Sequence, residues 1–295
     1  MAIDANIFKT DDSSAAYVNP EYWSEKLVKA LREKVILEKF GRTDYRGLGK
    51  NVKKILIPKN AYETASELTE GVQTPVSSLS YGQIEITFTE YGIAYQVSEK
   101  ELNSGFKFMM NDILERASWA LKDKKETVIR DALVSGAGLS YYAGGDTDSG
   151  TITSDNTLSF DDIIEAQALM KSNKVIPQVL IIHPNQEKEI KKLLVDSGSM
   201  IIQDKIVALQ SGFIGRILGM DVFVNNYVSS ATENSTTVYK ALMLGRDAFA
   251  VAYQQEAKVR FAEDSILDRA ITFEAHECYG VGILEPNAVL VLTSA

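Results

Sequence analysis

The sequence feature that most constrains the fold is the stretch from Phe106 to Ser135, which contains neither glycine nor proline. Because these two residue types most often bend or end a helix, the stretch predicts one unbroken helix. At 1.5 Å per residue, such a helix would be about 45 Å long. Ser98 and Glu101 precede it with the spacing of a capping box. A helix of this length is expected to act as a spine for the rest of the chain.

Apolar residues recur along this predicted helix at helical spacing, so one stripe is expected to face the core. The charged residues Asp123, Lys124, Lys125 and Glu126 are expected to form an exposed stretch. The predicted apolar stripe consists of Phe106, Met109, Ile113, Ala117, Ala120, Val128 and Ala132.

The composition is that of a globular chain, with 45% hydrophobic and 24% charged residues among 295. The formal net charge of −9 argues against a broad cationic surface for nucleic acid. Cys278 is the single cysteine, so no disulfide within the chain is possible and a reducing compartment is expected. The sequence shows neither a leader-like N-terminus nor an apolar run of membrane-spanning length, so secretion and membrane insertion are not expected.

Residues 53–97 have the pattern of a long β-hairpin. An outgoing strand alternates up to Pro58, and residues 59–82 are acidic, small and turn-prone. The returning strand alternates clearly, and its apolar positions change phase beyond Glu90, where Gly92 is the expected site of a bulge. The apolar residues are Ile55 and Ile57, then Ile84, Ile86 and Phe88, then Tyr91, Ile93, Tyr95 and Val97.

The rest of the chain divides into further expected elements. Residues 1–19 are polar and aperiodic, and a helix is expected after Pro20. A glycine-rich stretch near residue 140 is the expected boundary between two lobes. Beyond it, helices are expected from Ser159 and from Pro184 to Leu194, and strands at 178–183, 220–224, 238–244 and within 256–292.

Three glycine-containing segments resemble ligand-binding motifs, but each is incomplete. GLGKN at 47–51 resembles a phosphate loop, yet Asp44 replaces its first glycine and Asn51 its Ser or Thr. GVG at 280–282 lacks the third glycine of a dinucleotide site and is expected to serve backbone packing. DTDSG at 146–150 lacks the closing Glu of a calcium loop, so at most weak calcium binding at the surface is expected there.

The histidines and the cysteine show no catalytic or metal-binding pattern. His183 and His276 are the only histidines, and neither belongs to a ligand cluster or a triad motif. Cys278 lies two residues from His276 on one face of an expected strand, where a structural role is expected. The sequence therefore predicts no catalytic residue, no bound cofactor and no metal ligand, and the chain is not expected to be an enzyme.

The order of these elements resembles the Hong Kong 97-type fold of tailed-bacteriophage major capsid proteins. VLIIHPNQEKEIKKLL is similar to a strand and helix of that family's axial lobe, and ALMLGRDAFAVAY with ITFEAHECYGVGILEPNAVLVLT resembles its closing strands. The resemblance implies an α+β fold. Its parts would be an N-terminal arm and helix (1–52), an extended β-hairpin loop (53–97), a peripheral domain with the spine helix (98–139 and 257–295) and an α/β axial domain (140–256).

This resemblance implies a major capsid protein that self-assembles into hexamers and pentamers of an icosahedral shell around a double-stranded DNA genome. The implied partners are other copies of the chain, a portal and a separate scaffolding protein, since residues 1–50 are too few for the self-scaffolding region of some relatives. No sequence-specific DNA binding is implied. The implied location is the virion, after assembly in the host cytoplasm. The candidate contacts between subunits are Tyr62, Leu68, Val72, Val76, Trp23 and Leu27.

Three alternatives stay open. An encapsulin uses the same fold to enclose a cargo enzyme, an α/β enzyme would place active residues around His183 and Asn185, and a tail protein would form rings or tubes. Some relatives join subunits through a Lys–Asn isopeptide bond, and Lys59, Asn287 and Glu285 have matching residue types. Because these types are common, we expect no such bond and a shell that dissolves to monomers on a denaturing gel.

Overall fold

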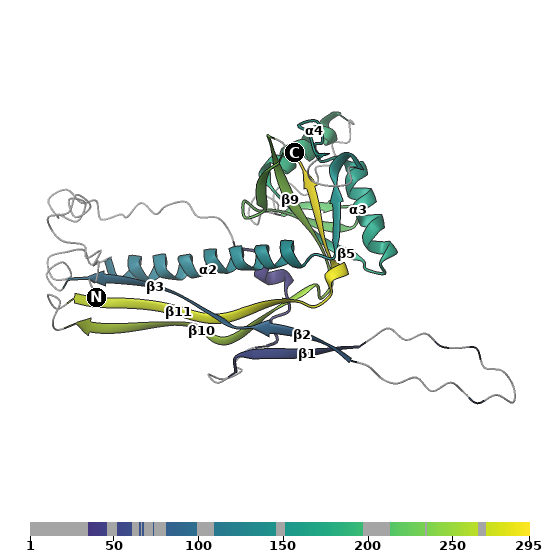
Figure 1. Cartoon of the computed structure of the whole chain (residues 1–295). Coiled ribbons are helices and arrows are strands. Elements are labelled where there is room, and N and C mark those ends of the chain that lie inside the picture. The colour runs from purple at the N-terminus through teal and green to yellow at the C-terminus, as the bar shows by residue number, and fades with distance from the viewer. Residues whose placement is uncertain are drawn as a thin grey trace.

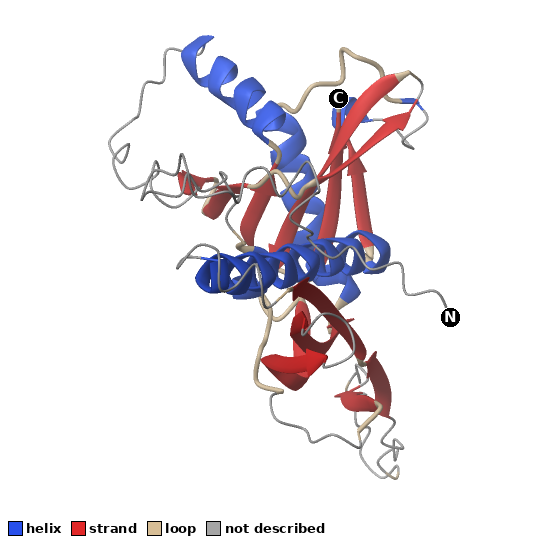
Figure 2. Ribbon diagram, turned by 90° about the vertical axis from the view of Figure 1, so that its left-hand side faces the viewer, coloured by secondary structure: helices blue, strands red, loops and turns tan. Residues whose placement is uncertain are grey.

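The computed structural model shows two β-sheets, a long helix and a projecting hairpin (Figure 1). In the perpendicular view of Figure 2, the strands form two separate groups with a helix between them. No helix among the residues that the structure describes is long and apolar enough to cross a membrane. The described residues are 35–45, 52–60, 65, 67, 73, 81–98, 109–145, 151–196, 213–233, 235–264 and 270–295.

The long helix α2 (Met109–Gly136) lies along a three-stranded antiparallel sheet. The order of this sheet is β10 (Phe249–Asp264), β11 (Ala270–Ile283) and β3 (Thr89–Val97). The helix has 28 residues, which confirms the predicted spine. Glu101 of the predicted capping box and residues 106–108 lie outside the described residues.

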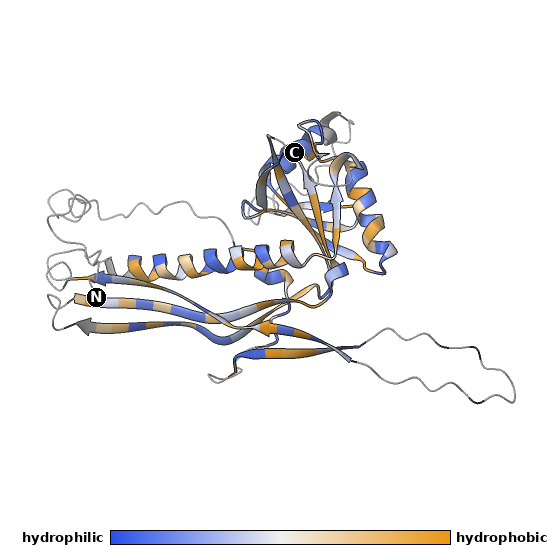
Figure 3. Cartoon of the chain, in the orientation of Figure 1, coloured by the Kyte–Doolittle hydropathy of each residue, from blue (hydrophilic) through white to orange (hydrophobic). Residues whose placement is uncertain are grey.

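The buried stripe of α2 differs in part from the predicted stripe. Ala120, Val128 and Ala132 are only half-buried. Lys125 and Glu126 are 8% and 0% exposed, so the prediction that this charged stretch lies in solvent was wrong for both. Hydrophilic and apolar residues are interleaved along the helix (Figure 3), and Lys125 and Glu126 meet partners from distant segments. The buried apolar side chains of α2 are Ile113, Ala117, Leu121, Ile129 and Leu133.

The projecting hairpin consists of β1 (Lys54–Asn60) and β2 (Tyr81–Thr87), paired antiparallel, which confirms the predicted hairpin. Only Phe88 separates β2 from β3, which belongs to the sheet under α2. The predicted bulge at Gly92 was wrong, because Gly92 pairs in continuous register with His276. The apolar positions change phase at Phe88, where the chain leaves one sheet and enters another.

The second sheet has seven strands and is packed against two helices, α3 (Phe160–Ser172) and α4 (Pro184–Asp196). Ser159 caps α3 in a capping box with Asp162, as the predicted start of this helix requires. The strand order is β4 (Leu139–Tyr142), β12 (Val289–Ser294), β9 (Thr236–Gly245), β5 (Pro177–Ile182), β7 (Met220–Val224) and β6 (Phe213–Ile217), with β8 (Ser229–Glu233) beside β9.

The last strand lies in a different sheet from the one expected. The predicted range 257–295 groups it with the spine helix, but β12 pairs parallel with β4 and antiparallel with β9. All six residues of β12 are buried, and a strand covered on both faces takes an inner position in a sheet. The sheet under α2 also takes in residues before 257, because β10 begins at Phe249.

The two largest apolar cores among the described residues hold these layers together. One core lies wholly within the seven-stranded sheet and its helices, where Met170, Leu180 and Ile190 are buried. The larger core joins both sheets through the end of α2, where Ile129 and Leu133 are both fully buried. The second half of the spine helix therefore connects the two sheets.

Candidate functional site

Charged side chains are buried where the 3₁₀ turn η3 (Leu37–Phe40), α2 and β11 meet. Lys125 Nζ lies 3.0 Å from Glu277 Oε2 and 3.9 Å from Glu38 Oε2. The side chains of Lys125 and Glu277 are only 10% and 3% exposed. We call the group Glu38, Lys125, Glu126 and Glu277 the charged junction.

Glu126 joins the arm segment 35–45 to α2 through a single carboxylate oxygen. Its Oε1 accepts hydrogen bonds from the backbone N–H groups of Ile36 and Leu37, each at 2.8 Å. The same oxygen accepts a third bond from Asn225 Nδ2 at 3.0 Å, beyond the end of β7. One buried side chain therefore ties together the arm segment, the spine helix and the seven-stranded sheet.

Aromatic rings surround the ammonium group of Lys125. Its Nζ lies 4.9 Å from the ring centroid of Tyr253 and 5.4 Å from that of Tyr279, within the range of cation–π attraction. The Tyr253 hydroxyl donates a hydrogen bond to Glu38 Oε1. The rings and the carboxylates together replace the water that Lys125 loses on burial.

The charges of this junction do not balance, because it contains three carboxyl groups and one ammonium group, which pairs with Glu277 and Glu38. Burial raises the pKa of Glu126, although its hydrogen bonds to Ile36, Leu37 and Asn225 oppose this shift. Burial also raises the pKa of Glu277, against the effect of Lys125. Glu126 Oε2 and Glu277 Oε1 are buried without a hydrogen-bond partner. The junction therefore favours proton uptake by its carboxyl groups.

The geometry of the junction suits fastening better than catalysis or metal binding. Within the described ranges, no three His, Cys, Asp or Glu side chains are grouped so that they could hold a metal ion. Lys125 occupies the centre of the carboxylates, where a cation would otherwise bind. The sequence missed this site because its members lie up to 239 positions apart, from Glu38 to Glu277, and only the folded chain brings them together.

The base of the hairpin lies directly on β11 at two glycines. A Cβ atom at Gly280 would lie 2.3 Å from the backbone oxygen of Thr87, and one at Gly282 would lie 2.4 Å from Ile86 Cγ1. Ile86 is fully buried at this crossing. The GVG segment therefore serves close backbone packing, which confirms that prediction.

An ion pair also holds the hairpin to the body of the subunit. Lys59 Nζ on β1 lies 2.6 Å from Glu285 Oε2, in the turn before β12. Both side chains are partly exposed, so the pair is expected to contribute little to stability, about 1 kcal/mol or less. It links the end of β1 to the turn before β12.

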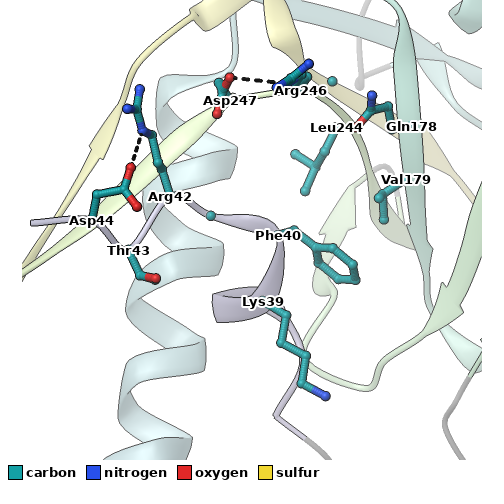
Figure 4. A pocket seen from close by; sticks show the side chains of 12 residues that line it. Lys39, Phe40, Arg42, Thr43, Asp44, Gln178, Val179, Leu244, Arg246 and Asp247 are labelled. Carbon is teal, nitrogen blue, oxygen red and sulfur yellow. Dashed lines mark hydrogen bonds and ion pairs between the residues drawn. The ribbon is translucent and has the colours of Figure 1, made fainter.

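A cleft of about 630 Å³ lies between the arm segment, the start of β5 and the turn from β9 to β10 (Figure 4). Four of its five charged groups form two pairs, with Arg42 Nε 2.7 Å from Asp44 Oδ2 and Arg246 Nε 3.6 Å from Asp247 Oδ2, and Lys39 is the fifth. The two pairs leave Lys39 as the one charged lining residue outside them.

His183 and Asn185, the residues of the enzyme alternative, have structural partners. The ring of His183 stacks on Tyr239 with centroids 4.2 Å apart, and its Nδ1 accepts the backbone N–H of Asn185 at 3.2 Å. The side chain of Asn185 donates to the Tyr239 hydroxyl. Burial lowers the pKa of His183, so its neutral form is favoured. This arrangement holds the beginning of α4 in place.

Cys278 and His276 both lie on β11, and His276 Nδ1 is buried without a hydrogen-bond partner in the described part of the chain. The Cys278 thiol lies 2.9 Å from Gln254 Oε1, and burial raises its pKa, which disfavours the reactive thiolate. His276 is buried on β11 opposite Gly92. Outside the described residues lie the segments 47–51 and 146–150, and all six predicted subunit contacts: Tyr62, Leu68, Val72, Val76, Trp23 and Leu27.

Comparisons with known proteins agree with the predicted fold. Residues 82–292 match the model of a family described as phage capsid protein. No curated protein matches the chain. A solved structure from Mycobacterium phage Che8 is 19% identical, with a TM-score of 0.69, and the alignment covers 92% of this chain and 96% of that chain. The capsid structure of Cyanophage P-SCSP1u is 14% identical, with a TM-score of 0.72, and the alignment covers 93% of this chain and 92% of that chain. The capsid of Ralstonia phage GP4 is 14% identical, with a TM-score of 0.67, and the alignment covers 98% of each chain. This likeness confirms the predicted α+β fold of the Hong Kong 97 type.

Proposed function

This chain belongs to the phage capsid protein family, and we propose that its copies form the hexamers and pentamers of an icosahedral head shell. As a capsid protein it is a shell component of the virion. The family is structural, and we propose that the chain has no catalytic role. The family match also favours a phage head over an encapsulin. In this proposal the sheet with α2 forms the peripheral lobe, and the seven-stranded sheet forms the axial lobe.

The observation that carries this proposal is the projecting hairpin. Figure 1 shows β1 and β2 extending away from both sheets. Leu56 and Tyr81 on these strands are 47% and 64% exposed. Because a two-stranded ribbon is marginally stable alone in water, a second surface is expected to cover it. We propose that this surface belongs to a neighbouring subunit.

The far end of the sheet under α2 offers a second contact surface. Residues 256–262 of β10 are exposed, and among the described strands this part pairs only with β11. Val259 and Phe261 are 44% and 58% exposed, which is unusual for apolar residues of a regular strand. We propose that neighbouring subunits cover this edge in the shell.

The proposed partners are further copies of the chain, a scaffolding protein, a portal and the enclosed double-stranded DNA. The net charge of −9 favours enclosure of the DNA without tight or sequence-specific binding. Assembly would take place in the host cytoplasm. DNA binding by free subunits should be weak and should disappear at raised salt concentration.

Electron microscopy of the purified protein tests the proposal. We expect capsomer rings or closed shells from the wild-type chain, because closed assembly is a geometric property that a monomeric enzyme lacks. A variant with Tyr62, Leu68, Val72 and Val76 all changed to Ser should keep its melting temperature and lose assembly. A matched variant of the same segment, with Thr64, Thr69, Thr74 and Ser77 changed to Ala, should assemble as the wild type does.

Two results would contradict this reading. One is a wild-type protein that stays monomeric even when co-expressed with its scaffolding protein. The other is normal assembly by the four-serine variant, which would remove the hairpin tip from the proposed contacts. The shells should also dissolve to monomers on a denaturing gel, because matching Lys and Asn residue types are common and do not by themselves indicate a covalent bond.

A further inference from the structure

The arm segment 35–45 is held on the body of the subunit by contacts that converge on Glu126. Ile36 and Leu37 are 5% and 1% exposed, and both donate their backbone N–H groups to this carboxyl group. The segment continues beside β10, where Arg42 N donates to Phe249 O and Val251 N to Arg42 O, each at 2.9 Å. Docking of the segment therefore completes the burial of Glu126.

The elements packed around the charged junction contribute its charged and titratable groups. The segment η3 brings Glu38, β11 brings Glu277 and Tyr279, and β10 brings Tyr253. The helix α2 itself brings Lys125, Asp123 and Arg130, and the loop after β7 brings Tyr227, whose hydroxyl donates to Asp123. Arg130 donates to Asp131 and to the backbone of Tyr227, so its described hydrogen bonds go elsewhere. Lys125 pairs with Glu277 and Glu38, and the described contacts give Glu126 no cation of its own.

We propose that the charged junction is a proton-operated latch, in which Glu126 takes up a proton as the arm segment 35–45 docks on the spine helix. The neutral carboxyl group keeps Oε1 as an acceptor for the two backbone N–H groups, so the fastening survives protonation. What protonation removes is the buried charge beside Glu38. Mild acid therefore closes the latch, and rising pH opens it.

The direction follows from the raised pKa of Glu126 in the docked state. With the arm released, Glu126 faces water and its pKa returns toward the ordinary value for glutamate, about 4.3. Docking is then fully favoured below this ordinary value and weakens as the pH rises through the raised pKa. Uptake of one proton changes the docking equilibrium by up to about tenfold per pH unit inside this window.

Hydrogen exchange of the intact chain, read by NMR and corrected for the intrinsic exchange rate, tests the proposal. The amide groups of Ile36 and Leu37 belong to the arm segment and report its docking directly. The amide groups of Val251 and Tyr253 on β10 report docking from the body, because they donate to the backbone oxygens of Arg42 and Tyr45. We expect their protection to fall at least tenfold between about pH 5 and about pH 8. Protection that is constant over this range, or that rises with pH, would overturn the latch.

Glu126→Gln removes the titrating group but keeps a hydrogen-bond acceptor for the arm segment. The amide keeps an acceptor oxygen for Ile36 and Leu37 and cannot ionise, so protection at the higher pH should equal or exceed that of the wild type at the lower pH. Asp131→Asn is the control, because Asp131 forms an exposed ion pair on the same helix, and it should leave the pH dependence unchanged. If Glu126→Gln instead lowers protection equally at both pH values, the ionised carboxylate is the required group and the proposal fails.

Glu277→Gln tests whether the proton is taken up by Glu126 and not by Glu277. This variant should retain the pH dependence of the Ile36 and Leu37 amides, because their acceptor is unchanged. Loss of the pH dependence here, together with its retention in Glu126→Gln, would place the proton on Glu277 and contradict the proposal. The readout is made on free subunits, so it does not depend on shell formation.

Discussion

The two sheets of this subunit are stabilised in different ways. The seven-stranded sheet encloses a large apolar core, contributed mainly by its own strands and by α3 and α4, and the described polar side chains buried with it are uncharged apart from Asp162. The three-stranded sheet buries Lys125, Glu126 and Glu277 near its centre, and its edge strand β10 is exposed from residue 256 to 262. One sheet is therefore complete within the subunit, whereas the other depends on paired charges, the arm segment and a neighbouring surface.

This difference suits a shell protein. A complete core lets the axial lobe fold before any partner is present. The peripheral lobe leaves the hairpin and the β10 edge uncovered, so contacts made on assembly add stability that the free subunit lacks. The charged junction lies between the two regions and determines how firmly the arm is held.

The largest effect is expected where a single substitution leaves a buried charge without its partner. Lys125→Met should reduce the free energy of unfolding by about 3–5 kcal/mol, because Glu277 would stay buried without a cation. The double variant Lys125→Met with Glu277→Leu should recover much of this loss. Urea unfolding of both variants measures the difference. Equal losses in the single and double variants would show that the ion pair does not govern stability here.

An apolar truncation in the complete sheet should have a slightly smaller effect and no effect on the arm. Leu180 on β5 is fully buried, and Leu180→Ala should cost about 3 kcal/mol through lost burial and a cavity. Exchange protection of the Ile36 amide should be unchanged relative to that in the wild type. A loss of protection there would show that the seven-stranded sheet is coupled to the latch more strongly than proposed.

The sequence predicted elements well and long-range contacts poorly. The span from Phe106 to Ser135, the alternating hairpin strands and the capping box at Ser159 each carry a local signal, and the structure contains the corresponding elements. The place of β12 and the burial of Lys125 and Glu126 depend on partners far away in the sequence. No periodicity within α2 indicates that Glu38 and Glu277 meet it, so a charged stretch was assigned to solvent.

The crossing of hairpin and sheet should tolerate little added volume. Gly280→Ala would place a Cβ atom 2.3 Å from the Thr87 backbone oxygen. The backbone must move to accommodate it, at a cost of about 1–3 kcal/mol. Thermal unfolding measures the loss, and weaker exchange protection of the β2 amides would locate it. Gly82→Ala is the control, since its added Cβ would meet only ordinary contact at 3.7 Å.

The smallest effect on the free subunit is expected at the uncovered edge of β10, where the effect on assembly should be large. Phe261 is 58% exposed and touches Phe273 edge to face, with ring centroids 5.3 Å apart, so Phe261→Ser removes one partial contact. The free energy of unfolding should fall by about 1 kcal/mol or less. If a neighbouring subunit covers this edge, the same change removes an apolar contact from every copy of a repeated interface, and the yield of closed particles should drop sharply.

Sedimentation and electron microscopy of Phe261→Ser at matched protein concentration compare these two effects. Leu218→Ser is a suitable control, because Leu218 is a similarly exposed apolar residue, at 45%, in the turn between β6 and β7 of the other sheet. Normal particles from Phe261→Ser would mean that the β10 edge stays uncovered in the shell. In that case the hairpin would carry the contacts that the three-stranded sheet needs.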